Sequence, residues 1–144
     1  MKYTDIRQQA VIEVITTGAA LQQRLDGALG TIKGISFSEH RILAAIAQSP
    51  NGSGSRVDVA RAVGLTASGV TRALRPLEKL GMVETIRDER DARRSLACLT
   101  EQGQELLSDA DGVIADTLAA LPGAQDLTEN QAAALLDALS KLVR

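Results

Sequence analysis

The sequence predicts a mainly α-helical protein with one small β-hairpin. Helical spacing of apolar residues recurs over most of the 144 residues, and one highly charged loop separates two short strand-like runs. The charge is also uneven, because residues 56–94 hold nine basic and six acidic residues while the rest of the chain holds seven and twelve. We therefore expect an acidic helical scaffold that presents a basic surface.

The first thirty residues predict one long helix, because they lack proline and place apolar side chains three or four positions apart. Gly30 and Gly34 interrupt this pattern. Ser36 and Glu39 then form a capping-box sequence, which predicts that a second helix begins there and continues to Gln48. A cluster of turn residues over 49–54 separates this helix from the next.

Two more helices are predicted on either side of a tight turn. Ser55 is placed to cap a short helix that ends before Gly64, whose permissive backbone allows the turn. Thr66 is placed to cap a longer helix that ends near Leu80, with Gly81 just beyond it. Two helices joined in this way, the second longer and more basic, have the pattern of a helix-turn-helix.

The second of these helices has two faces. The predicted core-facing stripe consists of Val70, Ala73, Leu74, Leu77 and Leu80. The opposite face combines hydroxyls and cations, namely Ser68, Thr71, Arg72, Arg75 and Lys79. Such a face fits the major groove of DNA, although on an isolated helix an ordinary solvated face is the more frequent explanation. Pro76 lies inside the helix and predicts a bend.

Residues 82–86 and 95–99 are expected to form a hairpin around the charged loop 87–94. Aspartate and arginine alternate in this loop, so we expect their side chains to pair and hold the tip in shape. At least one arginine would stay free to enter a minor groove, whose negative potential attracts guanidinium groups. The alternative is a solubilising tip whose charges cancel.

Two helices are predicted after the hairpin. Thr100 is placed to cap a helix that runs to about Ala120, where Pro122 and Gly123 break it, and Thr128 opens a last helix with a second capping-box sequence. These helices and the first one are rich in apolar residues and lie outside the basic unit. We therefore expect them to pack against the same helices of a second copy, in a two-fold dimer.

The composition argues against several classes of protein. No apolar run is long enough to cross a bilayer, and the N-terminus lacks a signal-peptide pattern, so we expect a cytoplasmic protein without membrane contact. One cysteine and one histidine, Cys98 and His40, cannot form a conventional metal site, and we expect no metal and no cofactor. A metal site made only of carboxylates remains an alternative, although no spacing of acidic residues predicts one. No nucleophile with its base and no phosphate-binding glycine motif is visible, so we expect no catalytic residues and no enzyme activity.

Three short sequence motifs, together with the order of elements, resemble the MarR (multiple antibiotic resistance regulator) family of winged helix-turn-helix transcription regulators. Residues 88–93 fit the pattern D-x-R-D-x-R, residues 76–83 read PLEKLGMV, and LTEQG follows at 99–103. The resemblance implies three parts: an N-terminal dimerisation helix over 1–34, a winged helix-turn-helix domain over 35–99, and C-terminal dimerisation helices over 100–144.

The resemblance also implies which residues contact double-stranded DNA. The helix from Thr66 to Leu80 would be the recognition helix, and the hairpin would be the wing, with Arg90 entering the minor groove. The expected DNA contacts are Thr66, Ser68, Gly69, Thr71, Arg72, Arg75, Lys79, Arg90, Arg93 and Arg94. Such a protein would act as a homodimer, as a repressor on a pseudo-palindromic operator with half-sites about one helical turn apart.

Family members are usually regulated by an anionic aromatic ligand or by cysteine oxidation where the wing domain meets the dimer region. Only Tyr3 and Phe37 are aromatic here, so we expect a mostly aliphatic pocket for a small anionic or apolar effector, with Phe37, His40 and Arg41 as contributors. Cys98 lies in a predicted strand, and we expect a buried apolar thiol there in preference to a redox switch.

Two other functions compete with DNA binding. The fold could serve protein contact, as a dimerising partner or antirepressor, or it could belong to a metal-sensing repressor. The absence of a Cys/His ligand set counts against the metal sensor. Arg72, Arg75 and Arg90 count against protein contact, because only DNA binding needs a basic helix face and an arginine wing tip together.

Overall fold

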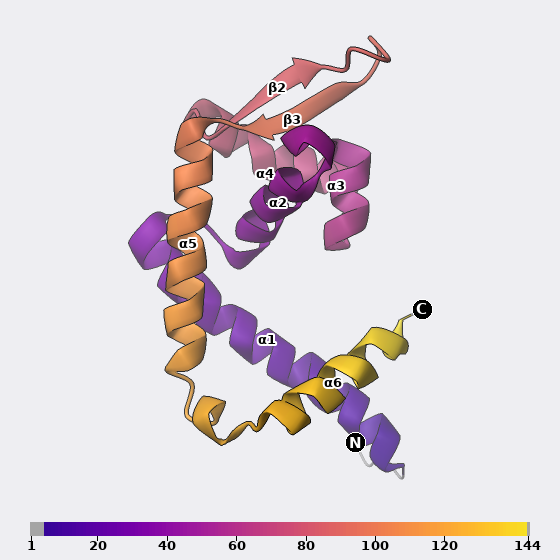
Figure 1. Ribbon diagram of the computed structural model, residues 1–144, viewed down its shortest axis with the longest axis vertical. Helices are drawn as coiled ribbons and strands as arrows, with labels where there is room; N and C mark the ends of the chain where they lie inside the picture. Colours follow the sequence, from indigo (N-terminus) through magenta and orange to yellow (C-terminus); the bar gives the residue numbers. More distant parts are fainter. Residues whose placement is uncertain (1–4, 144) are drawn as a thin grey trace.

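The computed structural model describes residues 5–143, and residues 1–4 and 144 of the predicted terminal segments lie outside this range. The described chain is mainly helical with a small antiparallel sheet, which confirms the predicted fold class (Figure 1). Its helices are α1 (Ile6–Lys33), α2 (Phe37–Gln48), α3 (Arg56–Val63), α4 (Ala67–Lys79), α5 (Glu101–Ala119) and α6 (Glu129–Leu142), with 3₁₀ turns at Pro50–Gly52 and Ala124–Asp126. Its strands are β1 (Ser53–Ser55), β2 (Val83–Arg87) and β3 (Ser95–Leu99).

Side-chain caps begin the helices where the sequence predicts them. The hydroxyl of the N-cap residue accepts a backbone N–H three residues later at Ser36, Ser55, Thr66, Thr100 and Thr128. The capping boxes of α2 and α6 are complete. Gly64 and Gly81 follow α3 and α4 with φ angles of 72° and 75°, a left-handed conformation that glycine adopts at little cost. Local interactions therefore decide most helix boundaries.

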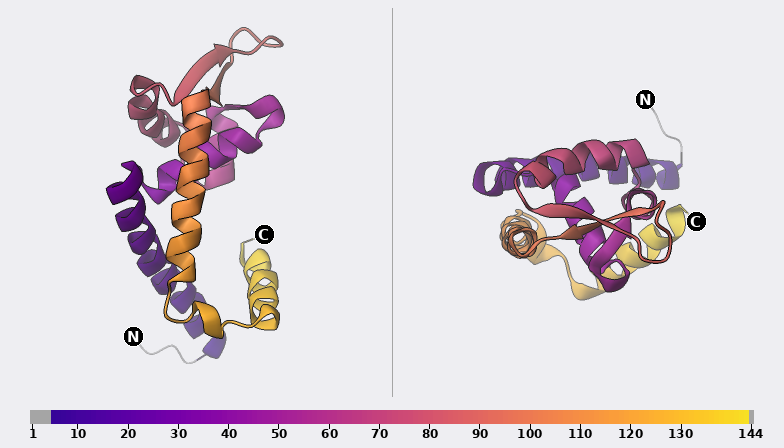
Figure 2. Two further views of the ribbon diagram at one scale, coloured as in Figure 1. Left: turned by 60° about the vertical axis from the view of Figure 1, so that its left-hand side comes forward. Right: turned by 90° about the horizontal axis from the view of Figure 1, so that it is seen from above.

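The elements form an upper and a lower part, which α5 connects (Figure 1). Helices α2, α3 and α4 gather beneath the sheet, while α5 descends from β3 beside α1, as both views of Figure 2 also show. An ion pair between Lys33 Nζ and Asp109 Oδ2, 3.1 Å apart, joins α1 to α5. Among residues 5–143 no helix combines the length and the apolar character needed to span a bilayer.

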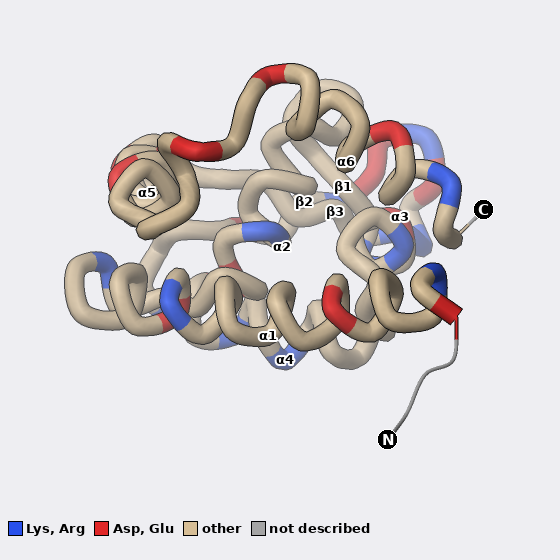
Figure 3. The backbone as a smooth tube through the Cα atoms, turned by 90° about the horizontal axis from the view of Figure 1, so that it is seen from below, with Lys and Arg blue, Asp and Glu red and all other residues tan. Residues whose placement is uncertain are grey.

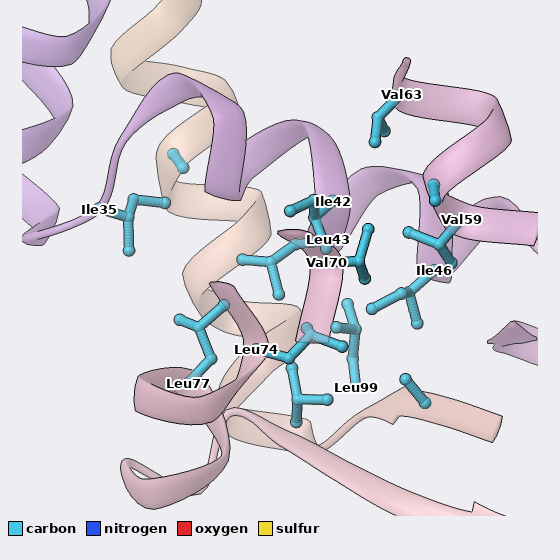
Figure 4. Close-up of a cluster of buried hydrophobic side chains, with 14 of the residues drawn as sticks. Ile35, Ile42, Leu43, Ile46, Val59, Val63, Val70, Leu74, Leu77 and Leu99 are labelled. Carbon is cyan, nitrogen blue, oxygen red and sulfur yellow. The ribbon is translucent and has the colours of Figure 1, made fainter. Parts of the chain in front are cut away.

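The hydrophobic core lies between α2, α3 and α4 and packs against β3 (Figure 4). Its largest fully buried side chains are Leu29, Ile42, Leu43, Ile46, Val59, Val70, Leu74 and Leu77. Val70, Leu74 and Leu77 are three of the five residues predicted to form the inner stripe of α4, and Ala73 is half-buried beside them. Burying one side of α4 in this way leaves its cationic side on the surface.

The fifth residue of that stripe, Leu80, is 67% exposed, so the prediction of a core position is wrong there. Helix α4 ends at Lys79, and Leu80 is its C-cap residue before the left-handed Gly81. Leu80 keeps helical dihedral angles and its N–H still donates to the Pro76 carbonyl, so the helical period places it at the edge of the stripe, one turn beyond the exposed Pro76. The helix runs through Pro76 without interruption, and the bend expected at this residue stays a prediction.

A third strand was not expected. The sequence predicts only a turn over 49–54, but Ser53–Ser55 pairs antiparallel with β3 and gives a sheet of order β1-β3-β2. A strand of three small residues has no apolar alternation to reveal it, and its pairing partner lies more than forty residues away. Gly54 packs tightly here, because a Cβ atom at this position would lie 2.6 Å from Ser49 Oγ and 3.0 Å from Val59 Cγ2, so a larger residue would force these side chains to shift.

The start of α5 presses closely against the strand connection before β2. The Thr100 hydroxyl donates to the Gly81 carbonyl at 2.6 Å, and the Thr100 N–H donates to the Met82 carbonyl at 3.0 Å. Gly103, one turn into α5, is buried, and a Cβ atom there would overlap the carbonyl oxygen of Met82. The absence of a side chain at Gly103 therefore allows α5 to pack directly on the backbone that leads into the hairpin.

Candidate nucleic-acid interface

The exposed face of α4 carries the cations predicted for it. Arg72, Arg75 and Lys79 are exposed, and none of them forms an ion pair with any residue of the described chain. Ser68 is exposed at the start of the helix. Figure 3 shows basic positions on α4, whereas the connection from α5 to α6 holds no basic residue and one acidic residue, Asp126. Three unpaired cations on one rigid helix are available to an anionic partner.

The hydroxyls of Thr66 and Thr71 and the N–H of Gly69 on this face already make hydrogen bonds within the helix and its cap. Thr66 Oγ1 accepts the Gly69 N–H at 3.0 Å and lies 3.3 Å from Ser68 Oγ. The Thr71 hydroxyl donates to the Ala67 carbonyl at 3.0 Å, so this oxygen keeps only its acceptor capacity. Gly69 is half-buried, and a Cβ atom there would be 3.1 Å from Thr66 Oγ1. Thr66 and Gly69 therefore shape the first turn of α4.

The wing tip is held by carboxylates that bind backbone amides. Asp88 Oδ1 accepts the Arg90 N–H and Asp91 Oδ1 accepts the Arg93 N–H, both at 3.0 Å. The expected pairing of aspartate with arginine side chains is therefore wrong for most of the loop, since only a loose 3.8 Å contact joins Arg93 Nε to Asp91. The backbone amides are nearer in the turn than the flexible guanidinium groups.

The three arginines of the tip differ in their surroundings. Arg90 is exposed and makes no ion pair with any residue between 5 and 143, and the Arg93 side chain is 96% exposed. Arg94 is engaged, because its Nη2 lies 3.0 Å from Asp58 Oδ2 on α3. Hence Arg90 keeps its charge available, while Arg94 fastens the returning strand of the wing to α3.

Asp58 is suited to hold Arg94. A hydrogen bond from the Ser55 hydroxyl, and then the charge of Arg94, keep the pKa of Asp58 below its ordinary value. A lowered carboxyl pKa means that the charged form persists at pH values where a free aspartate would already be protonated. The attachment of the wing to α3 therefore survives moderate acidification and is lost only as the pH falls through the lowered pKa.

Arg56 was not among the predicted site residues, but it lies between the recognition helix and the wing. Its Nη2 donates to Glu78 Oε1 on α4 at 3.0 Å and to the Thr85 hydroxyl on β2 at 3.1 Å. These partners are 22 and 29 residues away in the sequence. No local pattern could reveal such a cluster, because neither capping nor periodicity links residues so far apart.

The three residues proposed for an effector site lie together. Phe37, His40 and Arg41 line an open pocket of about 440 Å³ between α2 and the end of α3. The rings of Phe37 and His40 stack with centroids 5.9 Å apart. His40 Nε2 lies 2.7 Å from Asp111 Oδ1 on α5, while its Nδ1 is buried without a partner among the described residues. His40 therefore connects the pocket to α5.

Cys98 differs from the expected buried apolar thiol. Its side chain is only half-buried, and Sγ lies 3.6 Å from Glu84 Oε1 on the neighbouring strand. Partial burial, the negative charge of Glu84 and a hydrogen bond to it together raise the pKa of Cys98. The thiol form is thus favoured over the reactive thiolate.

We expect iodoacetamide to alkylate Cys98 severalfold more slowly in the native protein than in urea at the same neutral pH, because little thiolate is present. Mass spectrometry of timed samples would measure the two rates. Glu84→Gln removes the repelling charge and should accelerate alkylation of the native protein, whereas Glu89→Gln, an exposed glutamate in the wing loop, should not. Equal native and denatured rates would contradict this explanation.

Comparison with known proteins agrees with this architecture. Residues 33–94 match the profile of the MarR family. One similar solved structure is the transcriptional regulator BldR from Sulfolobus solfataricus, with 24% identity and a TM-score of 0.83 over 99% of this chain and 100% of that chain. Another is Sco3205, a MarR family transcriptional regulator from Streptomyces coelicolor in complex with DNA, with 24% identity and a TM-score of 0.85 over 97% of this chain and 87% of that chain.

A mutant of MarR from E. coli complexed with operator DNA is also similar, with 19% identity and a TM-score of 0.80 over 98% of this chain and 100% of that chain. No curated protein matches the sequence. The profile match covers the helix-turn-helix and most of the wing, and the structural likeness extends over nearly the whole chain. The resemblance inferred from the hairpin motif is therefore confirmed.

Proposed function

This chain has MarR family sequence over residues 33–94 and the MarR fold over nearly its whole length, and from this premise we propose that it is a transcription regulator that binds double-stranded DNA. The observation that carries the proposal is the set of unpaired cations on two separate elements, Arg72, Arg75 and Lys79 on α4 and Arg90 on the wing. Two of the similar structures are themselves complexes with DNA.

Each element suits a different groove. The major groove is wide enough for α4, where Arg72 and Arg75 can bond guanine bidentately. The Ser68 hydroxyl can contact bases or phosphates, whereas the free lone pairs of Thr71 can only accept from a base amino group. Arg90 at the wing tip suits the narrower minor groove, where the negative potential is strongest. Arg93 is 96% exposed and only loosely paired with Asp91, so its guanidinium group can reach a phosphate. Arg94 is held by Asp58 and supports the wing instead of contacting a base.

We further propose that the protein acts as a homodimer through its terminal helices. No residue of α6 is buried in the single chain, and Leu135, Leu136 and Leu142 are 47%, 69% and 48% exposed. On α1, Ile6 and Ile15 are 74% and 63% exposed. Large apolar faces of this kind require a partner. A two-fold dimer would place two copies of α4 on one side of the duplex, which calls for a pseudo-palindromic operator.

The chemistry of the pocket at Phe37, His40 and Arg41 suits a small anionic or apolar effector. Arg41 is exposed and unpaired among the described residues, so it is available to a carboxylate, and Phe37 offers an aromatic face. The pocket adjoins His40, whose other nitrogen contacts α5. A ligand there would act on the contact between the DNA-binding part and the helices of the dimer, and would release a repressor from its operator.

The first test is selection from a pool of random duplexes, followed by affinity measurements over a salt series. We expect a two-fold-symmetric site and a steep loss of affinity with salt, because bound cations displace counterions from the phosphates. Arg72→Ala should weaken binding about tenfold and relax the preference at one base pair in each half-site.

The matched control is Arg24→Ala, which removes an exposed arginine from α1 and should leave the base preference within each half-site unchanged. If no duplex is enriched and the wild-type protein does not bind DNA even at low salt, the DNA-binding proposal fails. In that case a protein partner of the winged helix becomes the better explanation.

A further inference from the structure

A closed triangle of hydrogen bonds joins three elements of the winged helix. Arg56 Nη2 donates to Glu78 Oε1 and to Thr85 Oγ1, and the Thr85 hydroxyl donates to the same Glu78 oxygen at 3.0 Å. Arg56 is the first residue of α3, Glu78 lies in the last turn of α4, and Thr85 is the middle residue of β2. One hydroxyl thus serves both as an acceptor and as a donor.

The triangle is partly removed from solvent. The side chain of Arg56 is 21% exposed and that of Glu78 is 34% exposed, so their attraction is screened less than that of a fully exposed pair. Arg56 Nη1 is buried without a partner among residues 5–143, so the bonds of Nη2 to Glu78 and Thr85 are the ones that hold this guanidinium group.

The other connections fix the base of the wing. The Met82 N–H donates to the Leu77 carbonyl at 2.9 Å, and Val83, the first residue of β2, is buried in the core. The link between α4 and β2 is a short turn through the left-handed Gly81. Arg94 binds Asp58, which attaches the returning strand β3 to α3 and not to α4. Beyond this base, the triangle is the polar side-chain contact that ties the middle of strand β2 to the last turn of α4.

We infer that Arg56, Glu78 and Thr85 are positioning residues, which hold the wing at a fixed distance and angle from the recognition helix without contacting DNA. The inference rests on the proposed function. Arg90 must enter a minor groove while α4 occupies the adjacent major groove, so β2 and α4 need a constant separation. A mobile wing would have to be ordered on binding, and this ordering would reduce the affinity for DNA.

The test replaces Thr85 by valine, which keeps the size and the branched Cβ but removes the hydroxyl. Arg56→Ala is the more obvious change, but it leaves the charge of Glu78 without its partner and can impair folding. Thr85→Ser is the matched control, because it restores the hydroxyl. We expect Thr85→Val to weaken operator binding about 3- to 10-fold, as losing one or two hydrogen bonds would, and Thr85→Ser to remain near wild type.

A measurement without DNA separates this inference from the proposed function. In the free protein, hydrogen exchange of the β2 amides should be about 3- to 10-fold faster in Thr85→Val than in Thr85→Ser, while exchange in α5 stays unchanged. Unchanged exchange in β2 would overturn the inference whatever the DNA result. If exchange in β2 is faster but the protein binds no duplex, the triangle does hold β2 against α4. The DNA-binding proposal then fails, and with it the role of the triangle in DNA binding.

A double-mutant cycle with the wing tip decides whether the effect on DNA acts through Arg90. If the triangle positions the wing, Thr85→Val should change affinity less than twofold once Arg90→Ala has removed the minor-groove contact. The same loss of affinity with and without Arg90 would overturn the positioning role and assign Thr85 a direct or merely structural one. Circular dichroism melting of each variant would show whether unfolding contributes.

Discussion

Gly103→Ala is expected to destabilise the protein by about 3 kcal/mol, because the new methyl group would overlap the carbonyl oxygen of Met82. This oxygen cannot move easily, since it also accepts the Thr100 N–H at the start of α5. Relief of the overlap requires α5 to move away from the connection between α4 and β2. The change should therefore loosen the wing as well as lower the free energy of unfolding.

Urea unfolding followed by circular dichroism would measure this loss. Gly112→Ala is the matched control in the same helix, because a Cβ atom there meets nothing within 4 Å. Alanine has a higher helix propensity than glycine, so the control should be neutral or more stable by about 0.5–1 kcal/mol. A Gly103→Ala protein as stable as the control would mean that α5 does not pack against Met82 as described.

A charged residue at Leu136 is expected to convert the proposed dimer to monomers and to weaken operator binding by about 100-fold or more. Leu136 is 69% exposed in the single chain and lies on a helix with no buried residue. If the second copy covers it, Leu136→Asp buries two unpaired carboxylates at once, which is strongly unfavourable. Monomers also lose the gain in affinity that comes from binding two half-sites together.

Analytical ultracentrifugation over a concentration series would measure the association, and titration of the selected duplex would measure the affinity. Leu80→Asp is the matched control for association, because Leu80 is 67% exposed but lies outside the terminal helices. This control should remain dimeric. If Leu136→Asp remains dimeric as well, α6 is not part of the interface, and the apolar face of α1 becomes the first place to look.

Much of the fold follows from local features of the sequence. The capping residues from Ser36 to Thr128 and the turn glycines Gly64 and Gly81 mark their elements correctly, because each acts through atoms within about three residues. The hairpin follows in the same way from two short apolar runs around a charged loop. The cations of α4 follow from the helical period, which places Arg72, Arg75 and Lys79 opposite the buried leucines.

Other features depend on contacts between distant parts of the chain. Strand β1 exists because the free edge of β3 is present to pair with it. Leu80 is exposed because no other part of the described chain covers the end of α4. Whether an arginine is paired cannot be derived from its residue type. Arg94 is bound to Asp58 because α3 lies beside it, whereas no carboxylate of the described chain pairs with Arg90.

The sequence by itself determined the helices, their caps, the hairpin and the cationic face of α4, since these depend on periodicity and on hydrogen bonds between near neighbours. Only the tertiary structure decided which charges are paired, how Arg56 joins α4 to β2, and which apolar faces remain without a partner in one chain. The physical reason is that an ion pair or a buried face needs two groups that packing brings together. A local sequence pattern contains one of these groups but does not identify its distant partner.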